Sequence, residues 1–145
     1  VVSDFLPGAA ELLSPDAPAD HLDVVEGQGS LFHPAYAAVS LGLLHGTQPD
    51  VIVACHQVGR ERMMGWDDIP VPDLPETIDL NLRLARRTNP AVRCAGVSLN
   101  TSSLTEPAAR AMLASESRRV GLAVADPIRG GAELHRLVAA CLEGG

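Results

Sequence analysis

Apolar residues occur in two kinds of run along this chain of 145 residues. Short runs rich in Val, Ile, Leu and Ala predict four strands, at residues 22–26, 50–55, 93–99 and 121–125. These runs are apolar on both faces, which is typical of strands in a parallel sheet that is covered on both sides. The stretches between them are long enough to hold crossover helices. The pattern therefore predicts a mostly parallel sheet.

Longer stretches with apolar residues at helical spacing predict the helices. The clearest runs over residues 75–88, where an apolar stripe follows an N-terminal capping pair, Asp73 and Glu76. Further helices are predicted at residues 5–13, 35–44, 105–117 and 132–142. This alternation of helices and strands predicts an α/β three-layer sandwich, and the length of the chain suits one domain over residues 1–145.

Residues 57–72 form the longest stretch that we expect to be irregular. This stretch carries Arg60, Arg62 and the only tryptophan, Trp66, and loops of this length in compact domains are often functional lids. All 11 basic residues are arginines, so a cation that holds a substrate anion must be an arginine or a metal. Arg60 and Arg62 are therefore candidates for binding a phosphate or a carboxylate, the alternative being solvated surface arginines.

Composition excludes several classes of function. The net charge of -7 and the scattered arginines argue against a nucleic-acid partner. No apolar run approaches the ~20 residues of a membrane span, so we expect no membrane partner. The three cysteines lack CxxC spacing and predict reduced, buried thiols, which is typical of a cytoplasmic protein.

The most informative local feature is the run from Glu26 to Ser30, Glu-Gly-Gln-Gly-Ser, at the end of the first predicted strand. Ligands of open α/β sheets bind beyond the carboxyl ends of the strands, where glycines let backbone N–H groups approach phosphates. Glu26 is thus a candidate metal ligand or general base. The alternative is a carboxylate that only accepts hydrogen bonds from the amides of its own loop.

Other polar residues follow the remaining strands. His33 could act as a general acid or base or bind an anion, or it could be an exposed histidine at the start of a helix. His56 lacks the second spaced ligand pair of a zinc site, so we expect a partly buried histidine. Asn100 could read a nucleobase or bind backbone in a turn. The remaining residues at strand ends are Asp4, Thr101, Ser102, Asp126 and Arg129.

Several known sequence motifs are absent from the chain. It contains no GxxxxGK[ST] phosphate loop, no GxGxxG, no GxSxG and no HExxH. A self-sufficient ATPase site is therefore excluded. The chain also begins with apolar residues that run straight into Asp4, as if a strand had been cut, and we expect it to be a fragment of a longer protein.

Five segments together resemble the carboxyl-terminal domain of the bacterial domain-of-unknown-function family 1611. They are VSDFLPGAAE (residues 2–11), EGQGSLFHPAY (26–36), LGLLHGTQPD (41–50), VSLNTSSL (97–104) and ADPIRGGAE (125–133). The resemblance covers essentially the whole chain. It implies a P-loop NTPase fold, similar in plan to dethiobiotin synthetase, from which this chain lacks the first strand and the phosphate loop with its lysine.

The resemblance also implies a function. Some members of the family are D-glutamate N-acetyltransferases, which suggests transfer of an acetyl group from acetyl-CoA to the amine of D-glutamate, a small-molecule substrate. The alternatives are a magnesium-dependent, ATP-using ligase or kinase like dethiobiotin synthetase, and a non-catalytic nucleotide-sensing domain. We expect the chain to be part of an enzyme, to be inactive by itself, and to form a homo-oligomer because a missing strand would expose a sheet edge.

The similarity to dethiobiotin synthetase implies that Glu26 is the metal carboxylate, that Asn100 reads the base and that Asp4 faces the phosphates, and the acetyl-transfer hypothesis adds further roles. In the acetyl-transfer version, Glu26 or His33 takes the proton of the D-glutamate amine, and loop amides polarise the thioester carbonyl. Arg60 or Arg62 would then hold a substrate carboxylate. The complete set has Glu26, His33 and Asp4 as catalytic candidates, Gly27, Gln28, Gly29, Ser30 and Asn100 for nucleotide or CoA, His56, Arg60 and Arg62 for substrate, and Glu26 also for Mg²⁺.

Overall fold

The computed structural model describes residues 4–18, 20–27 and 29–143, which form two compact units. Unit 1 comprises residues 1–50 and 79–92, and unit 2 comprises residues 51–78 and 93–145. The elements are α1 (Phe5–Leu13), α2 (Ala37–Thr47), β1 (Val51–Gln57), β2 (Arg62–Met63), β3 (Trp66–Pro70), α3 (Leu74–Ala85), β4 (Arg93–Asn100), α4 (Glu106–Val120), β5 (Ala123–Ala125) and α5 (Ala132–Leu142). Within the described ranges, no helix is long and apolar enough to cross a membrane.

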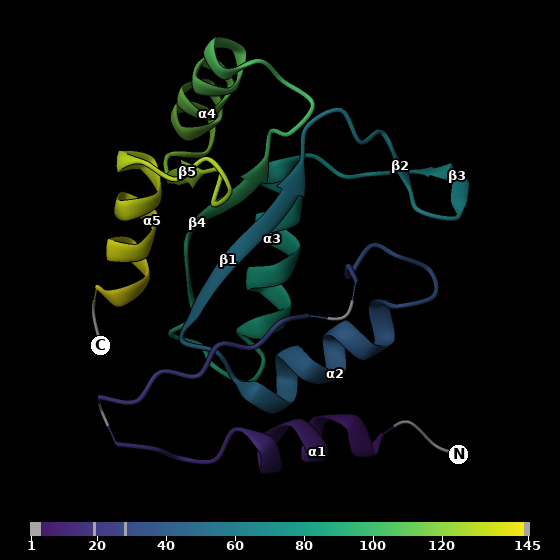
Figure 1. The fold of residues 1–145 in the computed structure, drawn as a ribbon. Coiled ribbons are helices and arrows are strands. Elements are labelled where there is room, and N and C mark those ends of the chain that lie inside the picture. Colours follow the sequence, from purple (N-terminus) through teal and green to yellow (C-terminus); the bar gives the residue numbers. More distant parts are fainter. Residues whose placement is uncertain (1–3, 19, 28, 144–145) are drawn as a thin grey trace. The chain divides into compact units, whose positions relative to one another are not determined.

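Unit 2 is built on a parallel sheet in the order β1-β4-β5 (Figure 1). Ala54 of β1 pairs with Val97 of β4, which in turn pairs with Val124 of β5. All three side chains are buried in one core cluster, because residues that pair across neighbouring strands share a face of the sheet. The three strands predicted near residues 50–55, 93–99 and 121–125 are confirmed.

Helices cover both faces of this sheet. On one face, Leu74 of α3 and Leu113 of α4 join the core cluster that contains Leu99. On the other face α5 packs on β4 and β5, and a Cβ added at Gly96 would lie 2.6 Å from Leu137 of α5. The chain thus has the predicted α/β architecture with a parallel sheet between helical layers.

Unit 1 contains α1, α2 and the second half of α3. α1 and α2 lie side by side (Figure 1), and Gly46 of α2 lets the two backbones approach closely, since a Cβ there would lie 2.7 Å from Ala10. The Nε2 of His45 lies 3.0 Å from the Leu84 carbonyl oxygen. The side chain of Asn89 donates hydrogen bonds to the segment that links α2 to β1, including Asp50. Side-chain hydrogen bonds therefore hold the loops of this unit together.

The strand predicted at residues 22–26 is wrong. Residues 21–27 form no regular secondary structure, and the side chains of Leu22 and Val24 are exposed. A strand persists only when its backbone pairs with a neighbour, and no described residue pairs with this segment. The apolar pattern indicates a tendency to form a strand, but it contains no information about a partner strand. Glu26 consequently lies in an extended, irregular segment.

The stretch at residues 57–72 is not irregular throughout. It contains an antiparallel hairpin formed by β2 and β3, in which Met63 pairs with Trp66. The two-residue turn between them, Met64-Gly65, has a positive φ at Gly65, a conformation that glycine adopts without steric cost. Glycine in this position was the signal for the hairpin that the sequence analysis missed.

The cysteines form no disulfide bond within the described residues, but the prediction that all three are buried is wrong. Cys94 and Cys141 are half-buried, whereas Cys55 is exposed. Successive side chains along a strand point to opposite faces. Because Ala54 points into the core, Cys55 points to the other face of β1, where it remains accessible.

We predict that Gly96→Ala destabilises the protein by about 1–3 kcal/mol, since the new methyl group would press on Leu137 and on the backbone carbonyl of Ala123. Urea unfolding followed by circular dichroism measures this loss. Gly8→Ala is the matched control, because nothing lies within 4 Å of its Cβ position in α1 and alanine favours a helix by ~1 kcal/mol. Equal stability of the two variants would contradict the packing described here.

Candidate functional site

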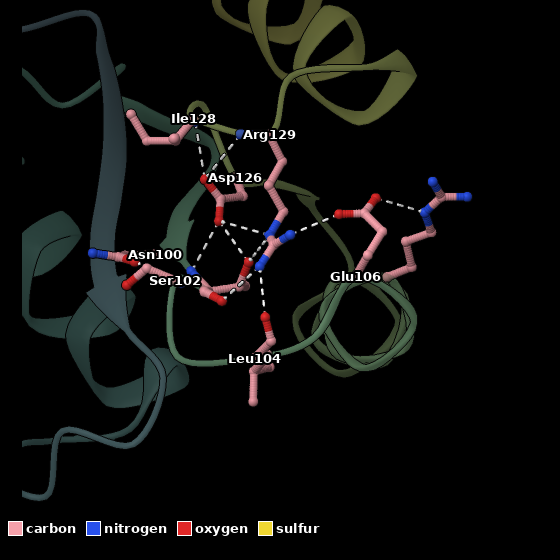
Figure 2. A network of polar contacts seen from close by, with 9 residues as sticks. Asn100, Ser102, Leu104, Glu106, Asp126, Ile128 and Arg129 are labelled. Carbon is pink, nitrogen blue, oxygen red and sulfur yellow. Dashed lines mark hydrogen bonds and ion pairs between the residues drawn. The ribbon is translucent and has the colours of Figure 1, made fainter.

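A buried carboxylate joins the loops that follow β4 and β5, at the carboxyl end of the sheet (Figure 2). Asp126, only 3% exposed, follows β5 directly. Its Oδ2 accepts hydrogen bonds from the backbone N–H of Thr101 at 2.9 Å and from the Thr101 hydroxyl at 2.5 Å. Its Oδ1 accepts the N–H of Ile128 at 2.9 Å. Oδ2 thus connects two loops whose bonded residues are 25 apart in sequence, while Oδ1 holds the turn of its own loop.

Arg129 completes this network. Its Nε donates to the Thr101 hydroxyl oxygen at 2.8 Å, and its Nη2 donates to the carbonyl oxygens of Thr101 and Leu104 at 3.1 and 2.8 Å. Its Nη1 donates to Glu106 at 2.6 Å. A guanidinium has five N–H groups, and most of those of Arg129 are engaged. Arg129 therefore holds the loop after β4 in place and has little capacity left for a ligand anion.

The electrostatics of Asp126 follow from these contacts. Burial alone would raise the pKa of Asp126, but the hydrogen bonds that it accepts from Thr101, Ile128 and Arg129 outweigh burial and bring the pKa below its ordinary value of 3.8. The carboxylate is consequently ionised across the physiological range, and its negative charge lies 3.6 Å from the guanidinium of Arg129.

Asn100 is the exposed residue that this network positions. It ends β4, pairs with Gln57 of β1, and accepts the backbone N–H of Ser102 through its side-chain oxygen at 2.9 Å (Figure 2). This bond is the turn contact that was one of the two alternatives predicted for Asn100. It also orients the side-chain NH₂ group, which makes no hydrogen bond to the described residues. The same side chain can therefore stabilise the turn and offer donors to a ligand.

His56 lines a small cavity in unit 2, of about 150 Å³. Asp73, Glu116 and Arg119 line the same cavity. Arg119 donates to Asp73 at 3.2 Å and to Glu116 at 2.9 Å, so the three charged groups form one cluster. No local sequence pattern predicts this cluster, because its charged members lie up to 46 residues apart. We call the cavity and these four side chains the His56 pocket.

The Glu26 segment lies in unit 1. Glu26 and Gly27 are exposed, and Gln28 lies outside the described residues. Gly29 has a φ of +75°, and a Cβ there would lie 2.9 Å from Tyr36, so a close approach of the chain to its own tyrosine requires glycine. The Ser30 hydroxyl oxygen accepts the N–H of Phe32 at 3.2 Å. The segment after Gly29 is thus a tight turn that leads into α2.

His33 belongs to the same turn. Its side chain is buried, its Nδ1 accepts the N–H of Ala35 at 3.1 Å, and its ring lies 4.5 Å from that of Tyr36, between centroids. Its carbonyl oxygen accepts the N–H of Ala37 at the start of α2. These contacts fix the beginning of the helix, which is a structural role that does not depend on catalysis. Asp4 is an exposed residue at the N-cap position of α1.

Arg60 and Arg62 are exposed in unit 2, beside and within the β2–β3 hairpin. Of the residues proposed from the sequence, the structure brings together Asn100, Thr101, Ser102, Asp126 and Arg129 at one edge of the sheet, as the strand-end argument predicts. His56 lies near this edge because it precedes Gln57, the partner of Asn100. Glu26, His33 and Asp4 belong to the other unit.

The described residues contain no group of three or more His, Cys, Asp or Glu side chains that could hold a metal ion. Mg²⁺ requires six oxygen ligands, although phosphates and water often supply most of them. Within this chain Glu26 offers a single exposed carboxylate. Binding of Mg²⁺ by Glu26 stays a prediction.

The parallel sheet between helical layers, with polar residues at its carboxyl edge, defines an open α/β domain, a class in which ligands bind beyond the carboxyl ends of the strands. Residues 1–138 match the model of one family, "Domain of unknown function (DUF1611_C) P-loop domain". The chain belongs to this family. The resemblance found in the sequence is therefore confirmed.

Two curated relatives and one solved structure agree with this assignment. A D-glutamate N-acetyltransferase of a Pseudoalteromonas species is 47% identical over 133 residues, which is 92% of this chain and 40% of the relative. One from Tritonibacter scottomollicae is 46% identical over 91% of this chain and 40% of its own length. The crystal structure of a DUF1611 family protein from Anabaena variabilis superposes with a TM-score of 0.86 at 32% identity, over 99% of this chain and 42% of that protein. The chain thus spans about two fifths of the length of these relatives.

We predict that Asp126→Asn destabilises the protein by about 3–5 kcal/mol at pH 7, because an amide turns donors toward the N–H and O–H groups that the carboxylate accepts. The pKa of Asp126 is lower in the folded protein than its ordinary value of 3.8. The ionised carboxylate therefore stabilises the folded protein above pH 3.8, and this contribution is lost as the pH falls through the pKa of the folded state. The difference in unfolding free energy between the two proteins should therefore narrow below pH 3.8. Urea unfolding at several pH values measures it.

The matched control is Glu106→Gln, which removes the exposed ionic partner of Arg129 and should change the stability much less than Asp126→Asn does, because exposed ion pairs contribute little. If both variants lost the same stability, the buried carboxylate would not be the group that holds the two loops together.

Proposed function

We propose that this chain is the P-loop-type domain of a D-glutamate N-acetyltransferase, an enzyme that transfers the acetyl group of acetyl-CoA to the amine of D-glutamate. The observation that carries the proposal is the identity of 47% and 46% with two relatives of that name over more than nine tenths of this chain. Because the chain spans 40% of each relative, the activity belongs to the full-length protein, in which this domain supplies part of the site.

In this proposal the carboxyl edge of unit 2 binds the acetyl donor. Asn100 supports this role, since its oriented NH₂ group can donate hydrogen bonds to the base of CoA or of a nucleotide. Gly27, Gln28, Gly29 and Ser30 of unit 1 stay candidates, from the sequence alone, for binding a nucleotide or CoA. Arg60 and Arg62 are exposed and can pair with a carboxylate of D-glutamate through bidentate hydrogen bonds.

A second function is favoured by the description of the family as a P-loop domain. Such domains bind ATP, and a magnesium-dependent ligase or kinase would use ATP with Glu26 as a metal carboxylate and Asp4 near the phosphates. The full-length protein distinguishes the two functions. Turnover of acetyl-CoA with D-glutamate supports the transferase, and consumption of ATP without acetyl-CoA turnover supports the ligase or kinase. Binding of either compound without any product would instead indicate a sensing domain.

We predict that the full-length protein forms N-acetyl-D-glutamate, detected by mass spectrometry. The variants Glu26→Gln and His33→Ala test the two proton acceptors that the sequence suggests. Loss of a general base lowers the rate ~10²–10⁴-fold. Asp20→Asn, at another exposed carboxylate of unit 1, is the matched control and should leave the rate unchanged. Wild-type rates in both Glu26→Gln and His33→Ala would show that neither residue takes the proton.

We also propose that the protein forms a homo-oligomer in the cytoplasm. β1 and β5 are the outer strands of the sheet among the described residues, and outer strands present unpaired backbone groups that invite pairing. Sedimentation velocity of the 145-residue chain should show a dimer or larger species, or poor solubility. A stable, monodisperse monomer would contradict this prediction.

A further inference from the structure

The His56 pocket has a polar wall and an apolar floor. The wall consists of His56, Asp73, Glu116 and Arg119, and the floor includes Leu74 and Leu99. Its volume of about 150 Å³ is below the ~300–1,000 Å³ of pockets that hold whole drug-sized ligands. The pocket can therefore take one small polar group, or one end of a larger molecule.

The pocket lies close to the edge of the sheet where ligands of parallel α/β domains bind. His56 is the next-to-last residue of β1 and pairs with Leu99, and Asn100 follows Leu99 at the end of β4. A group bound against His56 thus lies within unit 2, at the carboxyl end of β1.

The imidazole of His56 is able to accept a proton. The side chain is partly buried and forms no hydrogen bond with any described residue. Burial lowers the pKa of His56 below 6.5, Glu116 and Asp73 oppose that effect, and Arg119 adds to it. At pH 7 the ring is therefore neutral and has an unprotonated nitrogen.

The charges around the ring favour a cation. Arg119 is shared between two carboxylates, with its Nη1 3.2 Å from Asp73 and its Nη2 2.8 Å from Glu116. With His56 neutral, the wall carries two negative charges and one positive charge. This surplus of one negative charge attracts an ammonium group and repels a phosphate or a carboxylate. Because Arg119 holds both carboxylates, the wall is also organised before a ligand arrives.

We propose that the His56 pocket receives the ammonium group of the amino-acid substrate and that His56 is the base that takes a proton from it. This inference rests on the proposed acetyl transfer and assigns to one residue the step for which the sequence suggested Glu26 or His33. In His33 the Nδ1 already accepts the N–H of Ala35, and Glu26 lies in a segment without regular structure. Neither residue lines the His56 pocket, whose two carboxylates can hold an ammonium group.

The protons and electron pairs of the step balance. One proton of the substrate ammonium moves to His56, and the freed lone pair of the nitrogen forms a bond to the thioester carbonyl carbon. The tetrahedral intermediate collapses, the carbon–sulfur bond breaks, and its electron pair leaves with the CoA thiolate. The nitrogen loses a second proton, which neutralises the thiolate. His56 then releases its proton to water, so that each turnover yields the amide, the thiol and one proton.

The test uses full-length protein with acetyl-CoA and D-glutamate, and measures kcat/KM between pH 5 and 9. Wild-type kcat/KM should rise with pH to a plateau, with a midpoint below 6.5 set by His56. In His56→Ala the rate at pH 7 should fall ~10²–10⁴-fold. The plateau of the pH profile should also disappear, and kcat/KM should increase with pH across the whole range, because only the free amine of the substrate reacts. Added imidazole should restore part of the rate. His135→Ala, an exposed histidine of α5, is the matched control and should behave as wild type.

Each outcome separates the two proposals. Wild-type protein that forms no N-acetyl-D-glutamate would refute the proposed function and this inference together. Active wild-type protein would refute the inference alone if His56→Ala stayed within twofold of its rate, or if imidazole gave no rescue in a folded variant. Should His56→Ala fail to fold, the wild-type profile decides, since the absence of an acid limb with a midpoint below 6.5 is incompatible with His56 as the base.

Discussion

The interaction on which the described site depends is the burial of the Asp126 carboxylate. A buried charge is tolerated only when hydrogen bonds replace the water that it has lost. Thr101, Ile128 and Arg129 supply those bonds, and in doing so they connect the loops that follow β4 and β5. The position of Asn100, the residue before Thr101, is a direct consequence. The carboxyl edge of the sheet is thus shaped by an electrostatic requirement rather than by apolar packing alone.

The same network divides the polar residues into two groups. The side chains of the first group, Thr101, Asp126 and Arg129, form hydrogen bonds with one another. They therefore hold the edge of the sheet in place and have few donors or acceptors left for a ligand. The NH₂ group of Asn100 and the ring of His56 make no hydrogen bond with described residues. Polar atoms that the fold positions but does not use are the ones that can recognise a substrate. In unit 2 the chemistry is therefore expected from Asn100 and His56.

Much of the fold could be predicted from the sequence. Helices such as α1 and α5 lie at the predicted residues, and β1, β4 and β5 form the parallel sheet. The capping contact of α3 is also present, since Asp73 accepts the N–H of Glu76. The strand predicted from the apolar run at residues 22–26 does not form, because a strand needs a partner strand and no local pattern specifies one. The β2–β3 hairpin was missed although the glycine of its turn was visible.

The sequence by itself determined the family, the order of most elements and the polar character of the strand ends, because these depend on residue type and local periodicity. Only the tertiary structure decided which of those polar residues bind one another and which remain available. Thr101 and Asp126 are 25 residues apart, and Arg119 and Asp73 are 46 apart. Hydrogen bonds and ion pairs act over a few ångströms in space, so the Asp126 network and the His56 pocket exist only once the chain has folded.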